Sequence, residues 1–494
     1  MLLALLLILP YAPDRLIVYT ALLFPFLVGF LFAFPLSFAW GLTVLVVWGV
    51  SVAFVDAASL FKIYLTQVPI TSLDVRITFF DPFGFFDAMK WSRLTSVIVV
   101  GAILLIYVTV ISGAMQSILR GRRAIWPILI AVALLCTLTG ATFHQFGSRL
   151  LTAMNNAPDV SDDLWSPEGL SKTTLKVGGF SFLLATSMID EKKAILFSDL
   201  PTVRSAVAQP SMRSTLINDW QSSGDKKPNI VMVLMESTFD LNDSFDIQPK
   251  VESPLYGHPP GAILDGRLRV NTLGGGTWIT EFETISGMDT RLFGYAGYYT
   301  HVTLAPYLHD SLARYLAQRG YRTLGLYPVS GTSYSARKAY AQYGFSEFLD
   351  GEHFHIQHPY GTPDDGIVST YLKDLDGDDS KPFFAVALTA YNHAPHPCSP
   401  ETQTSLTYRF VGNTVADRDC QLNEYVNRMR TTERAIALLE DHLSEAQRRT
   451  GRSYLLVIYG DHQPHTFVGT QVTFYSHNYD DLRRSDKLTT IYQF

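Results

Sequence analysis

The sequence has no excess of positive charge, and charge of either sign is missing from long stretches. Its 494 residues include 39 Lys and Arg against 45 Asp and Glu, a net charge of −6, so there is no electrostatic case for binding nucleic acid. Residues 16–55, 94–119 and 124–148 contain no Asp, Glu, Lys or Arg. A helix of about 20 apolar residues crosses a bilayer. These stretches therefore predict membrane-spanning helices rather than buried helices of a soluble protein.

Four membrane helices are expected near residues 16–35, 38–58, 95–115 and 124–144, and residues 1–10 are a candidate for a fifth. The short loop before the last helix holds Arg120, Arg122 and Arg123, which predicts that this loop faces the cytoplasm. Everything after about residue 145 then lies outside a bacterial cytoplasmic membrane, on its periplasmic or extracellular side. The sequence thus predicts a transmembrane domain over 1–145, a connector near the membrane surface over 146–227, and an exported domain over 228–494.

Cysteine is also scarce, with three in the whole chain. Cys136 lies in a predicted membrane helix, where a thiol packs as a small apolar group. Cys398 and Cys420 lie in the exported domain, where disulfides persist. We expect a bridge between these two cysteines, which would close a polar loop.

The exported domain alternates short apolar runs with amphipathic segments. The runs at 229–235, 323–327, 383–390 and 454–459 fit buried strands, and the segments 307–318 and 423–448 have the apolar spacing of helices. This alternation predicts an α/β domain with a mainly parallel central sheet and flanking helices. In such sheets, chemistry gathers beyond the carboxyl ends of the strands.

Several polar residues stand at such positions. Glu236 directly follows the first run, and Asp461 and His462 follow the last. Carboxylate and imidazole ligands together suit Zn²⁺ or Mn²⁺, with Mg²⁺ as a further option. Three glycines precede Thr277 at the start of a helix-like segment, where a tight backbone and the peptide dipoles favour a phosphate. A threonine hydroxyl needs a base or a metal to act as a nucleophile, and one divalent ion held by the three side chains would activate Thr277.

Five motifs in this domain resemble the sulfatase and alkaline-phosphatase superfamily, and within it the lipoteichoic acid synthase and phosphoglycerol transferase branch: PNIVMVLMES, GGGTWITEFETISG, YGFSEFLD, LTAYNHAPH and VIYGDHQP. That family also has membrane helices before its exported domain. The resemblance implies an alkaline-phosphatase-like fold and Thr277 as the catalytic nucleophile. It implies one divalent metal ion with the ligands Glu236, Thr277, Asp461 and His462. It further implies that His393 and Arg337 bind the phosphate of the transferred group.

The resemblance implies a membrane-bound transferase that moves a phosphoglycerol-type headgroup. The donor would be an anionic phospholipid, the intermediate a covalent adduct on Thr277, and the acceptor a hydroxyl of a periplasmic or cell-surface glycan. One alternative is a phosphoethanolamine transferase acting on lipid A or another glycan, although such enzymes usually carry several disulfides. The others are a sulfatase-like phosphodiesterase and an inactive glycan-binding homologue, and the complete Glu–Thr–Asp–His set argues against the last.

The sequence departs from the family pattern in ways that bear on specificity. Ser335 stands two positions before Arg337, where an aromatic residue is expected from the family, so the identity of the headgroup stays open. The Cys/Ser-x-Pro-x-Arg setting of true sulfatases is missing and Thr277 takes the nucleophile position, which disfavours sulfate-ester hydrolysis. The family usually continues beyond the position of Phe494, which implies a further strand or helix.

Overall fold

The computed structural model of the protein describes residues 54–63, 68–75, 227–272, 274–376, 380–412, 416–464 and 489–493, and the single positions 174, 179, 182, 183 and 186. The chain divides into two compact units. One combines Met1–Asp87 with Trp91–Glu191, and the other combines Ala88–Lys90 with Lys192–Phe494.

In the first unit, residues 54–63 and 72–75 are helical. The second stretch begins with reciprocal capping, because Asp74 accepts from the N–H of Thr71 at 2.7 Å and the Thr71 hydroxyl accepts from the N–H of Asp74 at 3.4 Å. No helix among the described residues is both long enough and apolar enough to cross a membrane. The predicted membrane segments 1–10, 16–35, 95–115 and 124–144, and most of 38–58 and of the connector 146–227, lie outside the described residues.

The second unit is built on a seven-stranded sheet in the order β3–β9–β8–β1–β6–β4–β5. The five strands from β8 to β5 are parallel, whereas β9 is antiparallel to both of its neighbours. The strands are β1 (Asn229–Met235), β3 (Asp265–Arg269), β4 (Arg322–Leu326), β5 (Glu347–Leu349), β6 (Phe383–Leu388), β8 (Tyr454–Gly460) and β9 (Thr489–Gln493). A separate short pair joins β2 (Ile247–Gln248) to β7 (Arg409–Phe410).

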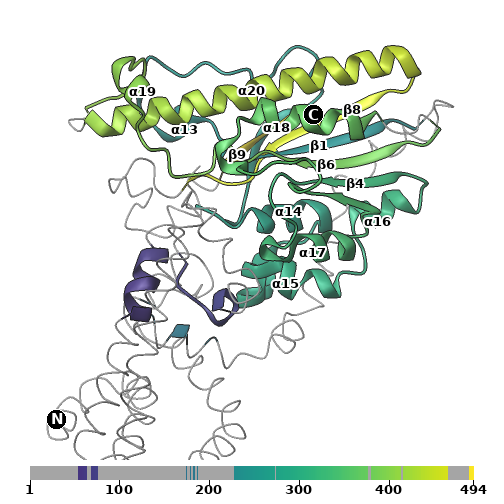
Figure 1. The fold of residues 1–494 in the computed structure, drawn as a ribbon, viewed down its shortest axis with the longest axis horizontal. Helices are drawn as coiled ribbons and strands as arrows, with labels where there is room; N and C mark the ends of the chain where they lie inside the picture. The colour runs from purple at the N-terminus through teal and green to yellow at the C-terminus, as the bar shows by residue number, and fades with distance from the viewer. Residues whose placement is uncertain are drawn as a thin grey trace, which may run out of the picture. The chain divides into compact units, whose positions relative to one another are not determined.

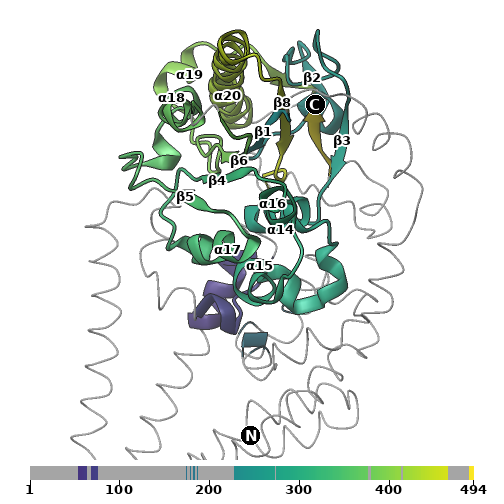
Figure 2. The same cartoon turned by 90° about the vertical axis from the view of Figure 1, so that its right-hand side faces the viewer.

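Helices cover both faces of the sheet (Figure 1, Figure 2). One face carries α18 (Asp364–Leu375) and α20 (Ala416–Thr450), and the other carries α14 (Thr277–Ser286), α15 (Thr300–Thr303), α16 (Leu312–Ala317) and α17 (Ala336–Tyr343). The remaining short helices are α13 (Leu241–Ser244), α19 (Pro400–Thr404) and the 3-10 turns η2 (Thr290–Tyr299), η3 (Ala305–Tyr307), η4 (Ser333–Ser335) and η5 (Pro359–Gly361).

The apolar run of β1 explains why both faces are covered. Val231 and Val233 pack in the core beside α18 and α20, whereas Met232 and Leu234 pack in the core beside α14 and α17. Successive side chains of a strand point to opposite faces, so a strand that is buried on both sides must be apolar at every position. The predicted α/β domain with a mainly parallel central sheet is confirmed.

Most predicted elements agree with the structure to within two residues at the strand ends, and the predicted helix 423–448 lies inside α20. The predicted helix 307–318 is wrong in its first half, because η3 ends at Tyr307 and α16 begins only at Leu312. Ser311 between them is extended, and its hydroxyl accepts from the N–H of Arg314 at 3.0 Å. Such a serine caps a new helix and does not continue an old one.

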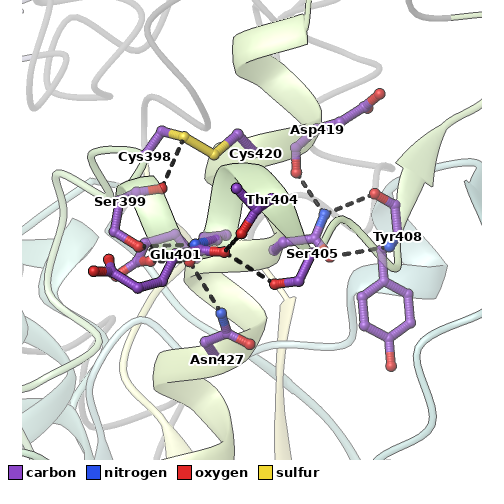
Figure 3. Close-up of a disulfide and its surroundings, with 12 residues drawn as sticks. Cys398, Ser399, Glu401, Thr404, Ser405, Tyr408, Asp419, Cys420 and Asn427 are labelled. Carbon is purple, nitrogen blue, oxygen red and sulfur yellow. Dashed lines mark hydrogen bonds between the residues drawn. A yellow bond between two sulfur atoms is a disulfide. The ribbon is translucent and has the colours of Figure 1, made fainter.

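The predicted disulfide is also confirmed. Figure 3 shows Cys398, in the segment that leads from β6 to α19, bonded to Cys420 on α20. The two Cα atoms are 5.4 Å apart, within the ordinary range for a bridge. The bond therefore fastens this segment to α20.

Candidate active site

The register of two central strands sets the position of the candidate site. β1 and β8 pair in parallel with Met235 opposite Gly460. Because the two strands end at the same edge of the sheet, the residues that follow them, Glu236 and Asp461, are neighbours. The N–H of Asp461 donates to the carbonyl of Met235 at 3.2 Å, which fixes the chain at this point.

Glu236, Asp461 and His462 form a buried cluster. Each offers one ligand atom, and these atoms lie within 4.8 Å of one another. The His462 Nε2 atom is 3.1 Å from Asp461 Oδ2 and 3.9 Å from Glu236 Oε1, and none of the three side chains is more than 6% exposed. Within the described part of the chain, His462 Nε2 has no hydrogen-bond partner. A buried ring nitrogen in this state, beside two carboxylates, fits a metal ligand.

Burial raises the pKa of both carboxyl groups in this cluster. The pKa of Glu236 lies well above its ordinary value of 4.5, first because the group is removed from water and second because Asp461 is next to it. Burial also raises the pKa of Asp461. Two adjacent carboxylates away from water need a compensating cation. One divalent ion would supply that charge, and the mixed oxygen and nitrogen donors suit Zn²⁺ or Mn²⁺.

Thr277 is the first residue of α14, and its hydroxyl donates to Asp461 Oδ2 at 2.9 Å. Two further hydrogen bonds fasten this part of the chain to the segment after β8. The Thr280 hydroxyl donates to the Asp461 carbonyl at 2.7 Å, and the N–H of Gly274 donates to the Gln463 carbonyl at 2.8 Å. The half-buried Thr277 hydroxyl is therefore held against the cluster.

The turn before Thr277 depends on glycine. Gly274, Gly275 and Gly276 have φ angles of 73°, 149° and 80°, a region that side-chain-bearing residues rarely adopt. A Cβ atom on Gly276 would lie 3.0 Å from the Thr272 hydroxyl oxygen. Gly276 also gives α14 no side-chain cap, so the positive end of the helix dipole is suited to an anion at this point.

His393, which the resemblance implies to be a phosphate ligand, lies in the segment after β6. Its ring is half-buried and lies against Tyr360, with the ring centres 4.5 Å apart. The preceding residue, Asn392, is fully buried, and its side-chain amide donates to the Ser237 carbonyl at 3.4 Å. The segment that carries His393 therefore borders the residue after Glu236.

Arg337 is placed differently. Its side chain is 52% exposed, and its guanidinium pairs with the buried carboxylate of Asp350. The segment that leads into Arg337 does border the start of α14, because Tyr334 stacks on Trp278, the residue after Thr277, with the ring centres 4.1 Å apart. The structure thus brings Thr277 into direct contact with the cluster, whereas the Arg337 guanidinium contacts Asp350.

Sequence patterns did not reveal two residues that organise the site. The Ser237 N–H donates to Asp461 Oδ1 at 2.7 Å, and its hydroxyl donates to Glu236 Oε1 at 2.7 Å. Tyr425, on α20, donates its hydroxyl to the Ser237 carbonyl at 2.6 Å. Adjacency to Glu236 was the one available signal for Ser237. Tyr425 stands 188 positions away, on an amphipathic helix where an aromatic residue looks like ordinary core.

Comparison with known proteins identifies the family of the chain. The family model for sulfatases matches residues 228–488, more than half of the chain. The chain belongs to the sulfatase family. The resemblance to the sulfatase and alkaline-phosphatase superfamily that the motifs indicated is therefore confirmed.

Individual relatives of this sulfatase-family chain are distant. An uncharacterized protein of Haemophilus influenzae is 25% identical over 270 residues, which are 51% of this chain and 46% of that protein. The chain thus spans less than half the length of this curated relative.

The solved structures that resemble this chain are also distant from it in sequence. The phosphoglycerol transferase GacH of Streptococcus pyogenes, in complex with sn-glycerol-1-phosphate, is 16% identical with a TM-score of 0.44 over 62% of this chain and 75% of its own. The lipoteichoic acid synthase LtaP of Listeria monocytogenes is 14% identical with a TM-score of 0.40 over 56% and 70%. The C-terminal periplasmic domain of EcEptC from Escherichia coli, in complex with Zn, is 14% identical with a TM-score of 0.35 over 55% and 73%.

Proposed function

We propose that this chain is a membrane-bound, metal-dependent phosphotransferase that moves a phosphoglycerol-type headgroup from an anionic phospholipid to a glycan hydroxyl. The observation that carries the proposal is the 2.9 Å hydrogen bond from the Thr277 hydroxyl to Asp461, inside a buried cluster with Glu236 and His462. A hydroxyl at a helix N-terminus, held against grouped metal-ligand atoms, suits covalent catalysis on a phosphate ester.

In the first step, Thr277 Oγ1 attacks the phosphorus of the headgroup. The bond from phosphorus to the diacylglycerol oxygen breaks, the phosphoglycerol group stays on Thr277, and the proton that Thr277 loses passes to the diacylglycerol oxygen by way of Asp461. Asp461 Oδ2 holds the proton that Thr277 gives up, since it already accepts the hydroxyl hydrogen bond. A divalent cation held by Glu236, Asp461 and His462 would lower the pKa of the Thr277 hydroxyl and neutralise charge on the phosphoryl oxygens.

In the second step, a hydroxyl of the acceptor attacks the same phosphorus. The bond from phosphorus to Thr277 Oγ1 breaks, and the proton that the acceptor hydroxyl loses passes to Thr277 Oγ1. His393 and Arg337 bind the phosphate oxygens in this proposal, and the planar guanidinium of Arg337 can pair with two of them. For that contact, Arg337 would turn from Asp350 to the phosphate.

The predicted membrane helices explain why such an enzyme would be tethered. The lipid donor is presented at the outer surface of the cytoplasmic membrane, and the exported domain would meet it there. The acceptor would be a glycan on the same side, in the periplasm or on the cell surface.

The test is mass spectrometry of the Thr277 peptide after the full chain is incubated with phosphatidylglycerol vesicles and Mn²⁺ or Zn²⁺. We expect the mass of a phosphoglycerol adduct on the parent protein and on Thr277→Ser, and no adduct on Thr277→Ala. Parallel vesicles of phosphatidylethanolamine test the alternative headgroup. Transfer by Thr277→Ala at the parental rate would overturn the proposal.

A further inference from the structure

One side of helix α20 holds the whole segment that carries His393. Four residues on this side, Cys420, Glu424, Arg428 and Thr432, follow one another at intervals of four and therefore lie in one row along the helix. We call this row the α20 row. Each of its members contacts the segment after β6 or a residue that holds this segment.

Thr432 acts at the start of the segment. Its hydroxyl donates to Asp364 Oδ2 at 2.6 Å. The other oxygen of this fully buried carboxylate accepts from the N–H groups of Ala390 and Tyr391, at 3.0 Å each. Ala390 and Tyr391, near the start of the segment after β6, are thus held in place through Asp364.

Cys420 and Glu424 act at the far end of the segment. Cys420 forms the disulfide with Cys398 (Figure 3). Glu424 Oε2 accepts from the hydroxyl of Thr402, in α19, at 2.8 Å. Both ends of the segment are therefore fastened to the same helix.

Arg428 acts in the middle, where His393 lies. Its guanidinium is buried, with 6% of the residue exposed. The Nη1 atom donates to the carbonyl of His393 at 3.3 Å and to the carbonyl of Pro395 at 3.2 Å, and Nε donates to Glu424 at 3.4 Å. The guanidinium carbon also lies 5.3 Å from the ring centre of Tyr391. One cation thus holds the backbone carbonyls on either side of Ala394, the first of which belongs to His393.

A buried guanidinium contributes little to the net free energy of folding. Its desolvation penalty can exceed its attraction to one carboxylate, and an apolar residue of similar size often stabilises a fold as well or better. What Arg428 provides is two directed hydrogen bonds to carbonyls that flank Ala394. Those bonds hold the loop in one conformation, which an apolar side chain of similar size could not do.

We propose that Arg428 is a positioning residue for phosphate binding, which acts on the substrate through His393 and not through the metal cluster. The inference rests on the proposed function, in which His393 contacts the phosphate. It makes the α20 row the support of the substrate-binding half of the site, whereas strands β1 and β8 support Glu236 and Asp461.

The experiment is a double-mutant cycle on the full chain, with phosphatidylglycerol vesicles as substrate. Arg428→Met should raise KM by about 10- to 100-fold with little change in kcat, because the metal cluster and Thr277 are untouched. The KM of Arg428→Lys should lie between the KM of the parent and that of Arg428→Met. A lysine ammonium lacks the planar guanidinium whose N–H groups donate in fixed directions. In a protein that already carries His393→Ala, Arg428→Met should change KM by less than about twofold, because the two residues act as a unit.

Arg430→Met is the matched control. Arg430 lies two positions along the same helix and also pairs with a glutamate, Glu433, at 2.6 Å. We expect parental KM from this variant. Metal affinity, measured by calorimetry with Mn²⁺, should be the same in all variants.

Equal fold-changes for Arg428→Met in the parent and in the His393→Ala background would overturn the inference, as would a loss of metal affinity. If Arg428→Met does not fold, the cycle is run with Arg428→Lys and judged by the same criterion. If the parent leaves phosphatidylglycerol intact, the proposed function fails by itself. The cycle is then measured on bis(4-nitrophenyl) phosphate, a phosphodiester that needs no lipid.

Discussion

Replacing Glu236 by glutamine should change stability in opposite directions with and without metal. In the metal-free protein, burial and Asp461 hold the pKa of Glu236 well above 4.5, so folding at neutral pH requires uptake of a proton or a buried unpaired charge. The interval from 4.5 to pH 7 limits the cost of proton uptake to about 3.4 kcal/mol, at about 1.36 kcal/mol per pH unit. Glutamine avoids this cost. We expect Glu236→Gln to raise the metal-free unfolding free energy at pH 7, by no more than this limit.

The dependence on pH has a definite sign. Because the pKa of Glu236 is higher in the folded than in the unfolded protein, the cost is absent below about pH 4.5 and grows as the pH rises. The advantage of the glutamine variant should therefore increase between about pH 5 and about pH 7. The assay is urea unfolding of the purified protein in a chelator, at a series of pH values.

Metal at a sufficient concentration should make the parent the more stable of the two proteins. A ligand at about 1,000 times its Kd stabilises the folded state by about 4.1 kcal/mol, which exceeds the largest metal-free advantage of the variant, and the parent should gain this from Mn²⁺ or Zn²⁺. Glu236→Gln should gain little, since a neutral amide replaces a charged ligand. The same unfolding experiment with added metal measures the difference.

Glu281→Gln is the matched control for this experiment. Glu281 is also a fully buried carboxyl with a pKa raised by burial, to about 8, but it bonds to Tyr340 at 2.7 Å and lies outside the ligand cluster. Its glutamine variant should be stabilised without metal and keep the full metal response. The reasoning fails if Glu236→Gln keeps that response, or if it is less stable than the parent in chelator.

Three further changes test other parts of the structure. Glu281→Gln should gain stability relative to the parent as the pH rises from about 4.5 to about 8. In this range the folded parent holds a proton on Glu281 that the unfolded parent releases, which favours unfolding of the parent alone; unfolding at a series of pH values measures the difference. Cys420→Ser should lower the unfolding free energy by about 3 kcal/mol, from a bridge with a sequence separation of 22, and the variant should no longer respond to reductant in thermal unfolding. Gly276→Ala should lower stability by about 1–2 kcal/mol and turnover more than about tenfold, because its Cβ would displace the turn before Thr277. Gly261→Ala, at a similar φ of 90° with nothing within 4 Å, should carry the backbone cost alone and keep parental turnover.

Strand-level features of the sulfatase-family domain could be predicted because they depend on local pattern. The run NIVMVLM is apolar from Ile230 to Met235, as a strand buried on both faces requires, and β1 has the predicted bounds. The positions of Glu236 and Asp461 followed from one rule about the ends of parallel strands. The glycines before Thr277 indicated a turn, and each of them has a positive φ.

Other features depend on contacts between distant parts of the chain, and local pattern does not contain them. The apolar spacing of 307–318 looks helical, but the side chain of Ser311 caps a new helix and divides the segment. The pairing of Arg337 with Asp350 joins two loops whose approach no spacing predicts. The amphipathic pattern of α20 indicated a helix, but it could not show that Arg428 reaches the carbonyl of His393.

The paired ends of β1 and β8 have a consequence for how this enzyme could change its specificity over evolution. The two strands are hydrogen-bonded along their full lengths in the middle of the sheet. Glu236 and Asp461, which follow these strands, therefore cannot move apart unless backbone hydrogen bonds between the strands break. Under the proposed function, a different headgroup or acceptor would therefore be accommodated by changes in the loops around the site, while Glu236 and Asp461 keep their spacing. Divergent members of such a lineage would share their chemistry and differ in what they recognise.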